Sequence, residues 1–127
     1  DFLRKINVLV CSVPLTESTR GLLSKKLFKK LEQPTYLINV ARGKVQIEND
    51  IIEAIDSGIL TGAFLDVFEN EPLPKSSSLW NNKKIKITPH IASITNTEAG
   101  AKQIIENYTR NINGQPLLNE VNLRKGY

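Results

Sequence analysis

The sequence predicts an α/β fold: a Rossmann-like parallel sheet with flanking helices, followed by a long C-terminal helix. Apolar, β-prone runs alternate with segments whose apolar residues recur at helical spacing, as in parallel strands joined by helices. Three of these runs lead directly into a chemically active side chain, namely Arg42, Asp66 or His90. Because ligands of parallel sheets bind beyond the carboxyl ends of the strands, these side chains indicate a site.

The first half of the chain contains two predicted strands and a short helix. Residues 6–13 form a continuous apolar run, which is typical of a strand buried on both faces of a sheet. Ser24 stands where the N-cap of a lysine-rich helix belongs, and Pro34 stops that helix. The second strand occupies most of residues 35–43 and delivers Arg42 to the sheet edge.

The middle of the chain continues the alternation. Residues 48–57 predict a second helix, and Gly58 suits the left-handed residue that follows a helix C-terminus. A strand at residues 62–67 comes next. The proline- and serine-rich stretch 69–82 is predicted to be a loop, and a further strand begins at Ile85.

A long helix is predicted from about Thr97 to Asn111, because Thr95 and Glu98 have the spacing of a capping box. We therefore divide the chain into residues 1–94, which carry the sheet, and residues 95–127, which carry the long helix and a tail.

Composition limits the classes of function. A chain of 127 residues with 40% hydrophobic and 24% charged residues can form a globular core. The single cysteine, Cys11, cannot form an internal disulfide, and neither a signal peptide nor a long apolar span is visible, so a cytoplasmic setting without membrane contact is expected. The net charge of +4 is modest, and we expect no nucleic-acid partner because no aromatic residues interleave the exposed lysines, which are Lys25, Lys26, Lys29 and Lys30.

The residues at the predicted strand ends suit the reduction of a 2-oxo acid. That reaction needs a hydride for the carbonyl carbon, a proton for its oxygen and a cation for the carboxylate. His90, the only histidine, is the natural proton donor, and Arg42 offers a planar fork for a carboxylate. Glu69 and Glu71 both qualify as the acid that orients His90, and spacing alone does not choose between them. No metal site is expected.

A lone histidine after Thr-Pro often does no more than end a strand, but an arginine and an acid at matching positions favour a site. The usual glycine-rich turn of a dinucleotide-binding domain, Gly-x-Gly-x-x-Gly, is missing, since the first strand leads to Cys11-Ser12-Val13-Pro14. We therefore expect the chain to supply the second half of such a domain.

Three motifs resemble signature blocks of the D-isomer-specific 2-hydroxyacid dehydrogenases: Asn39-Val40-Ala41-Arg42-Gly43, residues 65–74 and Thr88-Pro89-His90-Ile91-Ala92. Their order and intervals match the family, and the likeness covers essentially the whole chain. Within the family, the chain is most similar to the glyoxylate/hydroxypyruvate reductase A branch through residues 78–80, 91–95 and 124–127. Many members carry an acid soon after the Arg-Gly pair; Gln46 departs from this, which we expect to affect only the start of the next helix.

The resemblance implies specific roles. It makes Arg42, Glu71 and His90 catalytic and so selects Glu71 over Glu69. It makes Asp66 the acceptor for the nicotinamide amide, although from the residues alone Asp66 reads equally as a loop-capping acid. The implied cofactor-binding residues are Val13, Pro14, Val40, Ala41, Arg42, Asp66, His90, Ala92 and Ser93. Trp80 is expected to be a packing residue.

The resemblance also implies an NADP or NAD cofactor, with NADPH favoured by the branch, a small 2-oxo acid substrate such as glyoxylate or hydroxypyruvate, and a homodimeric intact enzyme. Two alternatives stay open: another 2-oxo acid, as in a phosphoglycerate dehydrogenase-like enzyme, or a non-catalytic dinucleotide sensor. The presence of a proton donor argues against the sensor. The chain alone is expected to be inactive, with the apolar stripe Ile104, Ile105 and Tyr108 left partly exposed or repacked.

Overall fold

The computed structural model describes residues 2–32, 34–94 and 96–126. The chain forms two compact units, Asp1–Ala92 and Ser93–Tyr127. The structure thus divides after Ala92, where the sequence predicted a division after residue 94.

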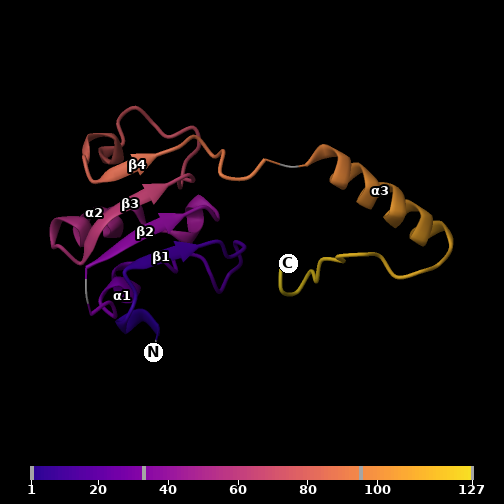
Figure 1. Cartoon of the computed structure of the whole chain (residues 1–127), viewed down its shortest axis with the longest axis horizontal. Helices are drawn as coiled ribbons and strands as arrows, with labels where there is room; N and C mark the ends of the chain where they lie inside the picture. Colours follow the sequence, from indigo (N-terminus) through magenta and orange to yellow (C-terminus); the bar gives the residue numbers. More distant parts are fainter. Residues whose placement is uncertain (1, 33, 95, 127) are drawn as a thin grey trace. The chain divides into compact units, whose positions relative to one another are not determined.

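The first unit is built on a four-stranded parallel sheet, which confirms the predicted fold class (Figure 1). Its strands, in spatial order, are β1 (Val8–Cys11), β2 (Thr35–Asn39), β3 (Leu60–Leu65) and β4 (Ile85–Ile87). Every neighbouring pair is parallel, so all four carboxyl ends lie at one edge of the sheet. β3 begins before its predicted start and ends at Leu65, which leaves Asp66 just beyond the strand.

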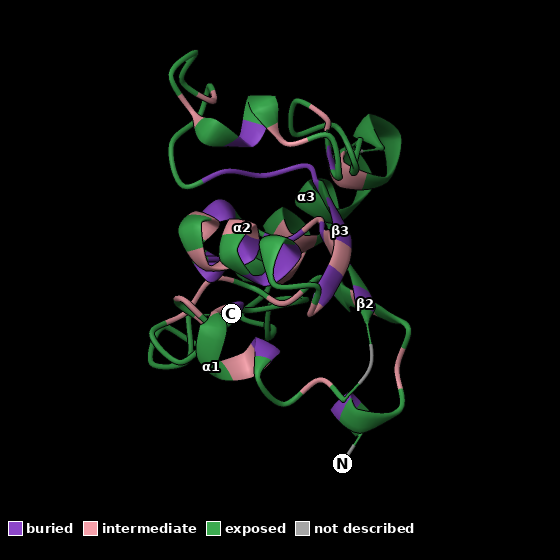
Figure 2. Cartoon of the chain, turned by 90° about the vertical axis from the view of Figure 1, so that its left-hand side faces the viewer, coloured by how far each residue is buried: buried purple, intermediate pink, exposed green. Residues whose placement is uncertain are grey.

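Two helices, α1 (Lys25–Phe28) and α2 (Glu48–Asp56), pack with the sheet around one apolar core. Phe28 of α1 and Ile51 and Ile55 of α2 are almost fully buried in this core with Leu37 and Leu65 of the sheet. Figure 2 shows buried segments, drawn in purple, on α2 and on the strands of the sheet. Gly58 follows α2 with a positive φ of 79°, as predicted.

The lysine-rich helix is shorter than predicted. Ser24 is the N-cap of α1, but its side chain makes no capping hydrogen bond. Instead, the backbone N–H of Lys25 donates to Asp50 Oδ2 of α2 at 2.7 Å, and Lys25 Nζ pairs with Glu53 at the same distance. A helix of one turn is marginal alone, so α2 and the buried Phe28 stabilise it.

The prediction that the first strand is buried on both faces was wrong. Val8 and Val10 are 48% and 58% exposed. They lie beside Tyr36 and Ile38 of β2 on one face of the sheet, where Tyr36 and Phe64 are also exposed. Within the described residues, α1 and α2 join the core of the opposite face, and β1 is an edge strand.

Among the described residues of the first unit there are also three short 3₁₀ segments: η1 (Phe2–Arg4), η2 (Gly43–Val45) and η3 (Ser78–Asn81). η3 lies within the segment that was predicted to be an irregular loop.

The second unit contains α3 (Thr97–Ile112), none of whose residues is buried. Asn96 caps it, since its Oδ1 accepts the N–H of Ala99 at 3.0 Å. The predicted capping box depended on Thr95, which lies outside the described residues. Asn107 anchors the following tail through two hydrogen bonds with the backbone of Leu118. Neither α3 nor any other described helix combines the length and apolarity that crossing a membrane requires.

Candidate active site

The end of β2 is fixed by a buried polar network. Asn39, which is fully buried, accepts the N–H of Ala41 at 3.0 Å and donates to Gln46 Oε1 at 2.8 Å. Gln46 Nε2 in turn donates to the carbonyl oxygen of Val67 at 3.0 Å. Gln46 therefore ties the end of β2 to the segment that follows β3. The sequence predicted that Gln46 would affect only the start of α2. Its hydrogen bonds with Asn39 and Val67 correct that expectation.

Gly43 brings the turn after Arg42 against the segment that carries the acids. A Cβ atom at this position would lie 1.7 Å from the carbonyl oxygen of Phe68, which is impossible without moving the backbone. Only glycine permits this close approach.

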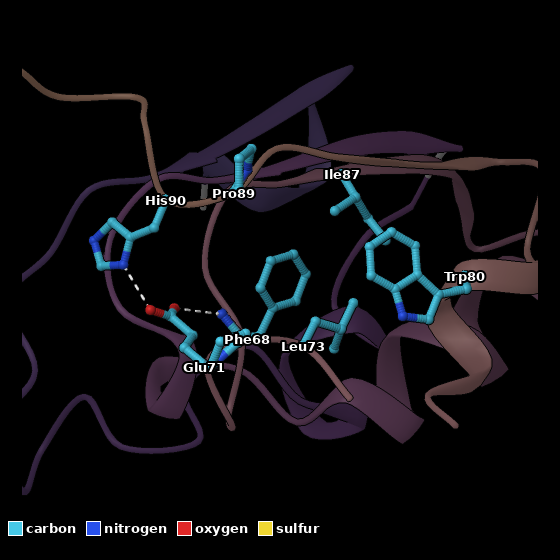
Figure 3. Close-up of a pocket in the computed structure, with 8 residues that line it drawn as sticks. Phe68, Glu71, Leu73, Trp80, Ile87, Pro89 and His90 are labelled. Carbon is cyan, nitrogen blue, oxygen red and sulfur yellow. Dashed lines mark hydrogen bonds and ion pairs between the residues drawn. The ribbon is translucent and has the colours of Figure 1, made fainter. Parts of the chain in front are cut away.

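Glu71 contacts the ring of His90, whereas Glu69 does not serve it. Glu71 Oε2 lies 2.7 Å from His90 Nδ1, and Oε1 accepts the N–H of Phe68 at 2.9 Å (Figure 3). Burial tends to raise the pKa of Glu71, but the hydrogen bonds from His90 and Phe68 and the charge of His90 outweigh it, so the pKa lies below its ordinary value. Because Glu71 occupies Nδ1, Nε2 is the nitrogen left to face a reactant.

Glu69 is engaged in a separate exchange with the start of α2. Its Oε1 accepts the N–H of Glu48 at 2.9 Å, and Glu48 Oε1 accepts the N–H of Glu69 at 2.8 Å. Burial and the nearby Glu69 charge raise the pKa of Glu48, although backbone and side-chain hydrogen bonds oppose the rise. This reciprocal pair directs Glu69 away from the histidine.

Asp66, at the end of β3, is 1% exposed and accepts three hydrogen bonds from the turn that bears His90. Its Oδ1 accepts the hydroxyl of Thr88 and the N–H of Ile91, and its Oδ2 accepts the N–H of Ala92. Burial acts to raise the pKa of Asp66, but these hydrogen bonds together with the charge of His90 hold it below the ordinary value.

Arg42 is exposed just beyond β2. Its Nη1 donates to the carbonyl oxygen of Ala41 at 2.7 Å, which fixes one arm of the guanidinium. An arginine has five N–H donors, so the rest of the fork can still grip an anion.

An apolar pocket of about 470 Å³ lies beside the His90–Glu71 pair. Its lining consists of Phe68, Glu71, Pro72, Leu73, Trp80, Ile87, Pro89 and His90. Trp80 lines the pocket from η3 and is held by a hydrogen bond from its Nε1 to the carbonyl oxygen of Pro74 at 2.9 Å. In Figure 3 the second ring nitrogen of His90 lies on the side away from Leu73 and Trp80.

The predicted cofactor-binding residues follow successive strands at the same sheet edge. Val13 and Pro14 follow β1, Val40 to Arg42 follow β2, Asp66 follows β3, and His90 and Ala92 follow β4. Ser93 belongs to the second unit and is described apart from them.

Sequence reasoning missed three contributors to this site: Thr88, Gln46 and the backbone N–H of Phe68. The position of Thr88 directly before Pro89 and His90 was a visible signal, since a hydroxyl there can bond to a nearby carboxylate. Nothing local marks Gln46 as buried.

The comparison with known families decides the relationship. Residues 1–92 match the model of the D-isomer specific 2-hydroxyacid dehydrogenase NAD-binding domain. This chain belongs to that family. Along its whole length it is 42% identical to the glyoxylate/hydroxypyruvate reductase A of Photorhabdus laumondii and 37% identical to that of Klebsiella pneumoniae. It spans 41% of the length of each of these dehydrogenases.

Solved structures of 2-hydroxyacid dehydrogenases share the fold. A Xanthobacter autotrophicus enzyme in complex with NADPH and MES superposes with a TM-score of 0.91 at 45% identity, covering 95% of this chain and 50% of that one. The NADPH-dependent glyoxylate/hydroxypyruvate reductase of Sinorhizobium meliloti, in complex with NADP and sulfate, gives 0.92 at 39% identity, covering 99% and 42%.

Proposed function

We propose that this chain is the C-terminal part of an NAD(P)H-dependent 2-hydroxyacid dehydrogenase that reduces glyoxylate or hydroxypyruvate to the 2-hydroxy acid. The observation that carries the proposal is the contact of 2.7 Å between His90 Nδ1 and Glu71 Oε2 at the sheet edge where the other strand-end residues gather. A sensor of dinucleotides has no need for such an oriented proton donor.

The chemistry is divided among three side chains. The reduced cofactor, when bound, supplies the hydride to the carbonyl carbon. His90 donates a proton from Nε2 to the carbonyl oxygen, so that the C=O double bond becomes a C–OH group. Glu71 fixes the orientation of the ring through its contact with Nδ1.

Arg42 is the proposed anchor of the substrate carboxylate. A guanidinium can hold a carboxylate through two parallel hydrogen bonds, which sets the orientation of the adjoining carbonyl group. Its position beyond β2, the neighbour of β3, supports this role.

We propose NADPH as the preferred cofactor, since two structural neighbours were solved with NADPH or NADP. The residues present fit the nicotinamide end of a dinucleotide. Ala41 and Ala92 are small residues beside Arg42 and His90, which permits close approach of a flat ring. Val13 and Pro14, after β1, are instead placed beside the adenosine side of the cofactor. Val40 and Ser93 complete the proposed set.

The test uses the full-length enzyme and follows the loss of nicotinamide absorbance. NADPH with glyoxylate or hydroxypyruvate should give turnover on the order of 1–10³ per second. The same assay with NADH, and with 3-phosphohydroxypyruvate, separates the cofactors and the substrates. Absence of turnover with every 2-oxo acid would refute the proposal.

A second candidate substrate class is phosphorylated 2-oxo acids. It is favoured by the similarity to phosphoglycerate dehydrogenase from Lactobacillus plantarum, which superposes with a TM-score of 0.72 at 34% identity and covers 95% of this chain and 40% of that one. We also propose that the intact enzyme is a homodimer, which sedimentation analysis would test.

A further inference from the structure

Asp66 is the point at which the histidine-bearing turn is joined to the sheet. Its backbone N–H donates to the carbonyl oxygen of Asn39 at 3.0 Å, and its own carbonyl oxygen accepts the N–H of His90 at 2.8 Å. Its side chain is buried, and the carboxylate accepts the three donors of residues 88–92 described above. The main chain and the side chain of one residue therefore both hold the same turn.

That turn needs such support, because His90 adopts a left-handed backbone conformation with φ of 55°. A residue with a Cβ atom rarely adopts this conformation unless its surroundings impose it. The N–H of His90 bonds to Asp66 and Thr88 carbonyl oxygens, and the next two N–H groups both point to the Asp66 carboxylate.

We propose that Asp66 is a positioning residue: its carboxylate, clamped by Thr88, Ile91 and Ala92, holds His90 in the backbone conformation that presents its ring to Glu71. Glu71 then orients the ring, whereas Asp66 orients the backbone. This inference rests on the proposed function, in which His90 is the proton donor.

The proposal also limits the role that the family resemblance implies for Asp66. A carboxylate has about four acceptor positions. The chain itself fills three of them, two on Oδ1 and one on Oδ2. At most one position remains for a cofactor amide, so the main role of this side chain is to hold the turn of residues 88–92.

Asp66→Asn is a sharp test because the side chain keeps its shape but one of its two acceptor oxygens is replaced by an NH₂ donor. If the asparagine oxygen keeps the two donors at Oδ1, its NH₂ group faces the N–H of Ala92, and two donors then oppose each other. The matched control is Asp56→Asn, at the exposed C-terminal end of α2.

NMR of the 127-residue chain provides the first measurement. His90 is the only histidine, so its ring signals are unambiguous. Asp66→Asn should speed amide exchange of Ile91 and Ala92 by at least about tenfold and shift the His90 ring signals, while Asp56→Asn changes neither. Unchanged exchange and unchanged ring signals in Asp66→Asn would overturn the proposal.

If Asp66→Asn also destabilises β2 and β3, variants of Thr88 provide a second test of the proposed role of Asp66. Thr88→Val removes one of the three donors and leaves the carboxylate in place, so a smaller change in the same signals is expected. Thr88→Ser keeps the hydroxyl and should restore them. Equal behaviour of the valine and serine variants would count against the clamp.

Kinetics of the full-length enzyme separates positioning from cofactor binding. Asp66→Asn should lower kcat by roughly 10²-fold, within the range of general acid catalysis, and change the KM for the 2-oxo acid and the Kd for NADPH by less than about threefold. A weakened Kd with the turn signals intact would instead make Asp66 a cofactor ligand. If the wild-type enzyme reduces no 2-oxo acid, the proposed function fails, but the NMR result still reports on the clamp.

Discussion

At the scale of single residues, the site depends on which hydrogen-bond donor each carboxylate accepts from. Glu69, Glu71 and Asp66 lie within six residues of one another, yet each serves a different group: the start of α2, the His90 ring and the His90 backbone. This distribution separates a structural acid from two that act on the histidine. Glu69 and Glu71 are the same residue type, so the difference between these two comes from the contacts that each makes.

Two substitutions in the full-length enzyme should have different kinetic signatures. His90→Ala should lower kcat by roughly 10²–10⁴-fold and leave dinucleotide binding nearly unchanged, because the imidazole acts on the carbonyl oxygen. Arg42→Lys should raise the KM for the 2-oxo acid as well as lower kcat, since a point charge replaces a two-pronged grip. Steady-state kinetics and fluorescence titration with NADPH measure both. Near wild-type turnover of His90→Ala would remove it from the mechanism.

The stability of the chain should fall in acid. The folded-state pKa values of Asp66 and Glu71 lie below their ordinary values, so their contributions are fully present above the unfolded-state values, about 3.9 and 4.3. Each contribution is lost as the pH falls through the folded-state pKa. Urea unfolding from pH 7 to pH 3 should show this loss, and Glu71→Gln should make the acid limb less steep. Glu120→Gln, at an exposed position, should leave the profile unchanged.

At the scale of elements, close approach of two backbone segments positions the acids. Gly43 packs on Phe68, and Gln46 bonds to Val67, so the turn after β2 and the segment after β3 are held as one piece. Arg42 and Glu71 flank this junction along the chain. The contact between these two segments therefore helps to hold both Arg42, the proposed substrate anchor, and Glu71, the partner of His90, in place.

Gly43→Ala should destabilise the first unit strongly. Its Cβ would collide with the Phe68 carbonyl, and overpacking of this kind costs about 1–3 kcal/mol or more in the free energy of unfolding. Gly58→Ala is the control, since nothing lies within 4 Å of its Cβ and only the left-handed backbone is penalised, by about 1–2 kcal/mol. Urea unfolding followed by circular dichroism compares them. A cost for Gly43→Ala no larger than that for Gly58→Ala would contradict the close-packing account.

The elements also show what sequence reasoning can reach. β2, α2, the positive φ of Gly58 and the parallel order were predictable because periodicity, propensity and the αL preference of glycine act locally. The choice between Glu69 and Glu71 came only from the family resemblance, since it depends on contacts with Glu48 and His90 that are distant in sequence. The exposure of Val8 and Val10 was missed because an apolar run does not reveal which face the rest of the molecule covers.

At the scale of the whole molecule, the chain combines a sheet unit that carries the proposed catalytic groups with a helical unit that has little core of its own. α3 has no buried residue, and its Ile104, Ile105, Tyr108 and Ile112 are between 63% and 70% exposed. Apolar residues at this helical spacing form a stripe that usually packs against another surface. We propose that in the full-length enzyme this stripe packs on the substrate domain.

The isolated chain should therefore self-associate through the α3 stripe and fail to turn over glyoxylate. Sedimentation velocity at rising concentration should show a shift to larger species, because burying the stripe removes apolar surface from water. Ile104→Glu should suppress the shift, whereas Gln103→Glu adds the same charge at an exposed position outside the stripe and should not. Without a glycine-rich phosphate-binding turn, the chain should bind NADPH weakly and leave its absorbance constant in the presence of glyoxylate. Steady turnover by the 127-residue chain would show that the catalytic unit does not depend on further parts of the enzyme. Equal association of the Ile104→Glu and Gln103→Glu variants would show that the stripe is not the contact surface.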